Sequence, residues 1–69
     1  MKVTYDKQVD AMYIAMETIK PRGVKQTIAL NDDIIIDFDD DKKILGIEIL
    51  NASKNIKQKE LNLAEKAVA

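Results

Sequence analysis

The sequence predicts a small α+β domain, an antiparallel meander of four or five strands followed by one C-terminal amphipathic helix. Two observations indicate this fold class. Up to Leu50, short β-prone segments are separated by clusters of Asp, Asn, Gly and Pro, and such short connections favour antiparallel neighbours. From Asn55 onward the chain consists mainly of Lys, Gln, Glu, Leu and Ala, which are good helix formers. The 69 residues allow a single domain, with the sheet over residues 2–50 and the helix over about 55–68.

Five segments are predicted to be strands, because they alternate polar with apolar residues or are rich in Ile, Val and Tyr. They are Lys2–Tyr5, Asp10–Glu17, Val24–Leu30, Asp33–Phe38 and Lys43–Leu50. The second segment also contains Ala and Met residues that suit a helix, so a helix stays open there. Turn residues separate the segments, with Pro21 and Gly23 before the third and three consecutive Asp residues before the fifth.

The predicted C-terminal helix is amphipathic. Asn55, followed three residues later by Gln58, resembles a capping box at the start of the helix. On a helical wheel the apolar residues share one side, with Glu60 as the exception near the helix start. The apolar side contains Ile56, Leu61, Leu63, Ala64, Ala67 and Val68, and the polar side contains Lys59, Asn62, Glu65 and Lys66. This pattern predicts that the helix lies on one face of the sheet.

Alternation along the strands places apolar side chains on both faces of the sheet. In the fourth strand, Ile34, Ile36 and Phe38 share one face, while Ile35 lies on the other face with Asp37. One short helix covers one face only, and soluble monomers rarely expose a large apolar patch. We therefore expect a second copy of the chain to cover the other face in a homodimer.

Composition excludes several kinds of chemistry. The chain contains no Cys and no His, which removes disulfides, thiolate nucleophiles, the commonest metal ligand and the commonest general base. Eleven basic and twelve acidic residues leave a formal charge of -1, which disfavours nucleic-acid binding. The chain has no apolar run of about 18 residues, so no membrane span is expected. The first residues lack the apolar stretch of a signal peptide, so a cytoplasmic location is expected.

An acidic segment, Asp37–Glu48, matches an EF-hand calcium loop at positions 1, 3, 5, 8 and 12, but position 6 is Lys42 rather than Gly. Its flanks are predicted to be strands rather than helices. A three-residue hairpin loop, Asp40–Lys42, would place Phe38 opposite Ile44, Asp37 opposite Leu45 and Glu48 opposite Ile34. Asp37 and Glu48 would then lie on opposite faces, about 10 Å apart along the strand. The sequence therefore predicts no calcium site, and it predicts a left-handed backbone at Lys42.

The remaining charged residues form no recognisable catalytic constellation. Acidic side chains could pair for acid–base chemistry, but a flat sheet in so short a chain offers little cleft. These acidic residues are Asp10, Glu17, Asp33, Asp37 and Glu48. Basic residues gather at the helix start and around the loop without interleaved aromatic residues. They are Lys54, Lys57, Lys59, Lys20, Arg22 and Lys25. The sequence therefore predicts no catalytic, cofactor-binding or metal-binding residue and no enzyme activity.

Four segments carry a resemblance to a known family. They are Val3–Asp6, Asp10–Ile14, Ile34–Asp39 and Ile44–Ser53. Over residues 2–53 the chain resembles the DUF2283 family of small uncharacterised prokaryotic proteins, although it has Lys42 where the family's turn usually has Gly. The resemblance implies a small sheet-plus-helix domain and transfers no catalytic residues.

Three hypotheses about function follow. The leading one is a non-enzymatic homodimeric interaction or assembly module. The alternative is a small regulatory protein of antitoxin or DNA-binding type that acts through a basic edge created by dimerisation. The third is a small-ligand binder with a pocket between Tyr13, Met12 or Met16 and the helix, which requires polar groups that converge on an apolar cavity.

Overall fold

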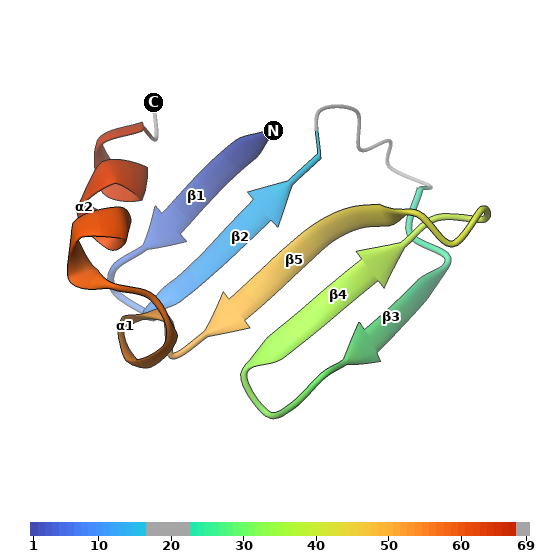
Figure 1. The fold of residues 1–69 in the computed structure, drawn as a ribbon, viewed down its shortest axis with the longest axis horizontal. Coiled ribbons are helices and arrows are strands. Elements are labelled where there is room, and N and C mark those ends of the chain that lie inside the picture. Colours follow the sequence, from blue (N-terminus) through green and yellow to red (C-terminus); the bar gives the residue numbers. More distant parts are fainter. Residues whose placement is uncertain (17–22, 68–69) are drawn as a thin grey trace.

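The computed structural model describes residues 1–16 and 23–67 and shows a five-stranded antiparallel sheet followed by two helices (Figure 1). The elements are β1 (Lys2–Asp6), β2 (Ala11–Ala15), β3 (Gln26–Ala29), β4 (Ile34–Phe38), β5 (Ile44–Leu50), α1 (Ala52–Asn55) and α2 (Gln58–Ala67). The α+β class and all five predicted strands are confirmed, and the second segment is a strand. Glu17, Lys20, Pro21 and Arg22, which the sequence analysis singled out, lie outside the described residues.

The order of the strands differs from a meander. The sheet runs β1-β2-β5-β4-β3, so only β3, β4 and β5 follow one another as a meander, and β5 lies between β2 and β4 (Figure 1). Met12 and Ile14 of β2 pair with Ile49 and Ile47 of β5. The longest strand, which is also strongly apolar, is thereby paired on both sides at the centre of the sheet.

The C-terminal region contains two helices rather than one, and the predicted helix start at Asn55 is wrong. Asn55 ends α1, and Ile56 has an extended backbone with φ -123° and ψ 138°. The capping box does not form, because Asn55 is the last residue of α1 and is followed by the extended Ile56. The side-chain NH2 group of Asn55 donates to Asp33 Oδ2 and to the Leu50 and Asn51 carbonyl oxygens. The Gln58 amide instead donates to Asn62 Oδ1 within α2. Neither described helix is both long enough and apolar enough to cross a membrane.

The core is small and lies between the helices and the β1–β2–β5 part of the sheet. Its buried residues are Met12, Ile49, Ala52, Leu61 and Ala64. Helix α2 packs mainly against β1, with Leu61 and Ala64 toward the sheet as predicted. Leu63 does not join them and is 60% exposed, because it is two residues, or about 200°, around the helix from Leu61. The side chains of Ala67 and Val68 lie outside the described residues.

Candidate functional site

Asp10 connects α1 to the turn between β1 and β2 through hydrogen bonds. Its carboxylate accepts hydrogen bonds from the Tyr5 hydroxyl at 2.7 Å, the Ser53 hydroxyl at 2.6 Å and the Ser53 backbone N–H at 3.0 Å. Its backbone carbonyl also accepts from the Ala52 N–H, and its φ of 54° is left-handed. The bonds from Ser53 and then Tyr5 lower the pKa of Asp10. The Asp10 side chain therefore stays a deprotonated hydrogen-bond acceptor that connects parts of the fold, whereas a general acid must carry a proton.

Asp33 has a similar role and contacts both ends of α1. The side-chain amides of Asn51 and Asn55 donate to its two carboxylate oxygens at 2.9 and 3.1 Å. The Leu50 N–H donates to its backbone carbonyl at 2.7 Å. The bond from Asn51, followed by the bond from Asn55, lowers the pKa of Asp33. Asp33 thus ties the β3–β4 turn to the corner where β5 leads into α1.

One face of the sheet, which we call the polar face, carries Tyr13, Asp37 and Glu48. The side chain of Tyr13 crosses this face over Gly46. Its hydroxyl donates to Asp37 Oδ2 at 2.8 Å, and the Thr27 hydroxyl donates to Asp37 Oδ1 at 2.9 Å. A Cβ atom at position 46 would overlap the Tyr13 ring, with ring atom Cε2 only 3.0 Å away. Burial, followed by the bond to Asp37, raises the pKa of Tyr13 to about 12, so the hydroxyl stays protonated as a donor. Sequence reasoning missed this contact, although a Gly inside a strand is a known sign of close approach.

The predicted placement of Glu48 is wrong by one residue, because β5 contains a bulge. Asp37 pairs with Gly46, whereas Phe38 pairs with Ile44 as predicted, so Leu45 is an extra residue. Glu48 consequently pairs with Ile35 rather than Ile34. Asp37 and Glu48 therefore share the polar face with Tyr13, instead of lying on opposite faces.

The acidic turn between β4 and β5 is a hairpin loop. Asp39 Oδ1 accepts from the backbone N–H groups of Asp41 and Lys43 at 2.8 and 3.0 Å, which is an Asx turn. Lys42 has a φ of 63°, which confirms the predicted left-handed position. Within residues 1–16 and 23–67, no group of three or more acidic side chains is placed to hold a metal ion. The residues that match EF-hand positions therefore form the hairpin turn and parts of the two strands beside it.

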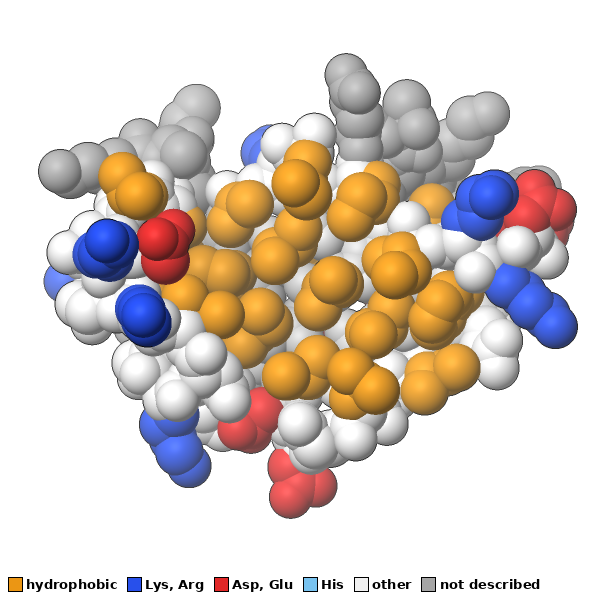
Figure 2. Space-filling model, viewed as in Figure 1, with side chains coloured by type: hydrophobic (Ala, Val, Ile, Leu, Met, Phe, Trp, Pro, Cys, Tyr) orange, Lys and Arg blue, Asp and Glu red, His pale blue; other side chains and the backbone are white. Residues whose placement is uncertain are grey.

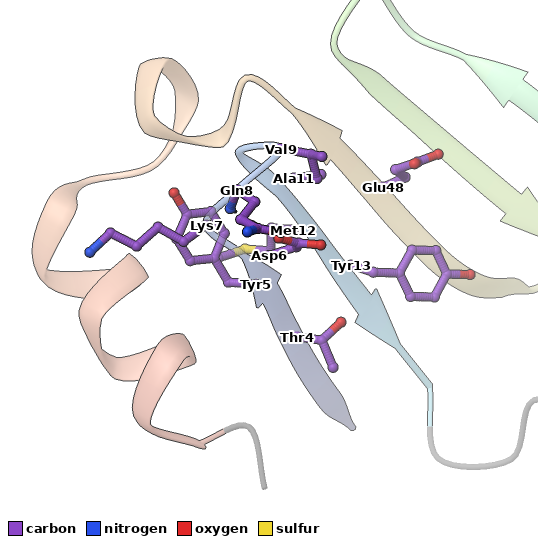
Figure 3. A pocket seen from close by; sticks show the side chains of 10 residues that line it. All are labelled: Thr4, Tyr5, Asp6, Lys7, Gln8, Val9, Ala11, Met12, Tyr13 and Glu48. Atoms are coloured by element: carbon purple, nitrogen blue, oxygen red, sulfur yellow. Dashed lines mark hydrogen bonds between the residues drawn. The ribbon is translucent and has the colours of Figure 1, made fainter.

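An open depression lies on the polar face beside the β1–β2 turn (Figure 3). Its polar residues include Thr4, Lys7, Tyr13 and Glu48. Figure 3 shows that these side chains diverge, since Lys7 extends toward the helices while Tyr13 and Glu48 lie over β5. Catalysis requires groups that converge on one reacting atom, and this arrangement does not provide them.

An extended apolar surface occupies the other face of the sheet, beside the helices (Figure 2). The strand register places on this face a group that we call the apolar half-face. It consists of Ile28, Leu30, Ile34, Ile36, Phe38, Ile44, Leu45 and Ile47. Ile28, Leu30 and Ile44 are 42%, 64% and 44% exposed. This finding corrects the predicted position of the uncovered patch, which lies on the same face as α2 and not on the opposite one.

The width of the helix explains why the half-face is uncovered. An α-helix is about 10 Å across, and strands lie about 4.8 Å apart, so one helix covers about two strands. Helix α2 stands over the β1 side, so none of the described elements forms a layer over β4 and β3 (Figure 1).

A groove between α2 and the sheet continues the apolar half-face. It is lined by Val3, Met12, Ile14, Ile56, Glu60, Leu63 and Ala64. Ile14 pairs with Ile47 of the half-face, so the two surfaces meet there. Met12 lines this groove beside α2, as the ligand-pocket hypothesis expected, whereas Tyr13 points to the opposite face and does not line it.

Comparisons with known proteins agree with the resemblance seen in the sequence. Residues 2–53 match the family described as "Protein of unknown function (DUF2283)". Over 54 residues the chain is 46% identical to "Uncharacterized protein MJ0789" of Methanocaldococcus jannaschii. That match covers 78% of this chain and 43% of the relative, so the chain spans less than half of the relative's length. No solved structure matches the chain. The matched residues include all five strands together with Asp10, Asp33, Tyr13 and Gly46, and the chain belongs to the DUF2283 family.

Proposed function

We propose that this domain is a non-enzymatic homodimeric assembly module that pairs through the apolar half-face. The observation that carries the proposal is the continuous apolar surface over β5, β4 and β3, which no described element covers (Figure 2). Removal of such an apolar surface from water favours association. Contiguous apolar patches on soluble proteins commonly mark interaction sites.

The polar side chains support a role without catalysis. Asp10, Asp33 and Asp37 each accept at least two hydrogen bonds that hold elements of the fold together. Lys7 and Glu48, which border the open depression, point in different directions (Figure 3). The side chains suited to acid–base chemistry are therefore engaged in structure or separated from one another.

The alternative function, a regulatory protein of antitoxin or DNA-binding type, rests on the exposed Lys54, Lys57 and Lys59 around the junction of α1 and α2. Glu60 lies beside them, and the chain as a whole has a formal charge of -1. Binding to nucleic acid would fall steeply with salt, because it depends on the release of counterions. Titration of labelled duplex DNA at two salt concentrations distinguishes this function from protein-mediated assembly.

Light scattering on a matched pair of variants tests the assembly module. Ile28→Asp and Ala29→Asp alter neighbouring exposed residues of β3 that point to opposite faces. We expect the wild type and Ala29→Asp at twice the 7.8 kDa chain mass, and Ile28→Asp at the chain mass, because an unpaired charge is costly in an apolar contact. A wild-type mass of 7.8 kDa at high micromolar concentration, or equal behaviour of the two variants, would overturn the proposal.

A further inference from the structure

We infer that the occupant of the α2 groove is the β3 edge of a second copy, with the two sheets face to face about a two-fold axis parallel to the strands. This inference rests on the proposed homodimer and adds its geometry. It assigns partners to Leu63 and Leu30, which are 60% and 64% exposed in the single chain.

The position of α2 restricts where the axis can run. A two-fold axis across the strands would bring the α2 helices of both copies together above the β1 sides of their sheets. Two stacked helices, each about 10 Å across, would hold the sheets too far apart for the half-faces to touch. In the single chain α2 lies at the β1 side of the sheet (Figure 1). An axis parallel to the strands moves the second α2 to the opposite flank, so the uncovered halves can meet.

Layer thickness then places the partner's β3 beside α2. Stacked sheets lie about 10 Å apart, which matches the thickness of a helix that rests on a sheet. The partner's sheet therefore fits into the same layer as α2, and its edge strand, β3, lies next to the helix. The α2 helix of the other copy thus covers each β3 edge. An uncovered edge strand can pair with other chains and lead to aggregation.

The strand register brings apolar residues to the correct height. A rotation about an axis parallel to the strands leaves each residue at its height along that axis. One row crosses the sheet from Ile14 of the groove through Ile47 and Ile36 to Ile28. The adjacent row crosses from Met12 of the groove through Ile49 and Ile34, whose carbonyl oxygen accepts from the Leu30 N–H. Ile28 and Leu30 of one copy thus arrive level with the groove of the other.

The area of the interface supports these flanking contacts. Three strands spaced by about 4.8 Å and roughly five residues long, at about 3.4 Å each, present only about 240 Å² of flat sheet. Even if side-chain relief doubled that area, it would fall short of the roughly 800 Å² per partner of a standard interface. The two groove contacts, one on each side of the axis, supply additional area.

Cross-linking tests the geometry cleanly, because the chain has no Cys of its own. Leu63→Cys and Leu30→Cys are made as separate single variants, mixed, allowed to exchange subunits and treated with a short bismaleimide. We expect a cross-linked dimer that contains one chain of each variant. Leu63→Cys alone should give no covalent dimer, since the axis separates the two α2 helices. The matched control mixes Leu63→Cys with Ala29→Cys, whose side chain points to the polar face, and should not cross-link.

The outcomes separate the geometry from the assembly itself. A covalent dimer of Leu63→Cys alone would show that the axis runs across the strands, and it would overturn the inference while leaving the homodimer intact. Equal cross-linking at positions 29 and 30 would also overturn it. If light scattering gives the mass of a single chain for the wild type, the proposed function fails, and the geometry fails with it.

Discussion

Replacement of Gly46 by Ala tests how the polar face of the sheet is built. The added Cβ would overlap the ring of Tyr13, so the ring must swing away. The Tyr13 hydroxyl would then lose its 2.8 Å bond to the Asp37 carboxylate, which is half-buried and would keep only the bond from Thr27. We expect Gly46→Ala to destabilise the fold although Ala suits a strand better than Gly.

The expected magnitude is a difference between two effects. A hydrogen bond to a charged group contributes about 1.5–3 kcal/mol. Replacement of a Gly inside a strand by Ala returns about 0.5–1 kcal/mol through backbone entropy. The free energy of unfolding should therefore fall by about 0.5–2.5 kcal/mol, which corresponds to a decrease in Tm of about 2–20 °C for a domain of this size.

A double-mutant cycle identifies the cause. Tyr13→Val keeps a β-prone residue in β2 but removes the ring and hydroxyl that lie over Gly46. In this background Gly46→Ala should stabilise the fold by about 0.5–1 kcal/mol, because only the entropic gain remains. Urea unfolding monitored by circular dichroism measures all four proteins at one fixed chain concentration, since dimerisation makes apparent stability depend on concentration. The same loss from Gly46→Ala in both backgrounds would refute the close contact between Tyr13 and Gly46.

Three further predictions concern the turns and their charges. Lys42→Gly should stabilise the fold by several tenths to about 1 kcal/mol in urea melts at high salt, because Lys42 has a φ of 63° and salt screens the lost charge. The pKa of Asp33 is lowered below its ordinary value of 3.8, so its contribution to stability is complete above that value and is lost as the pH falls through the lower folded pKa. Thermal melts between pH 4 and strong acid should therefore show a smaller loss of stability for Asp33→Asn than for the wild type. An equal loss in the two proteins would contradict the bonds from Asn51 and Asn55. Calorimetry with calcium at physiological salt should show no specific binding, because Asp39 is engaged in the hairpin turn; micromolar affinity abolished by Glu48→Gln would contradict this structure.

The five strands could be predicted because their information is local. Alternating side chains and clusters of turn residues act over a few neighbouring positions, and the left-handed position of Lys42 follows from the length of its loop alone. The register between β4 and β5 could not be predicted to the residue. The bulge at Leu45 adds one residue to β5 that the alternation pattern does not reveal, and it places Glu48 on the same face as Asp37 rather than on the opposite one.

The C-terminal helix shows the same limit. Its amphipathic pattern correctly placed Leu61 and Ala64 toward the core, but Asn55 is a good helix-capping residue that the structure uses elsewhere. Its amide binds the Asp33 carboxylate, 22 residues earlier in the chain. The spacing of Asn55 and Gln58 could not reveal that Asn55 ends a separate helix, α1, because contacts with Asp10 and Asp33 that exist only in the folded chain hold α1 in place.

The sequence by itself determined the α+β class, the five strands, the apolar character of the sheet, the absence of Cys and His chemistry, and the family. The tertiary structure decided the strand order, the bulge, and which half of the apolar face α2 covers. The physical reason is the range of the interactions. Periodicity and turn chemistry are set by residues a few positions apart, whereas the position of β5 between β2 and β4, and of a 10-residue helix over the β1 side, follows from contacts between distant segments that exist only after folding.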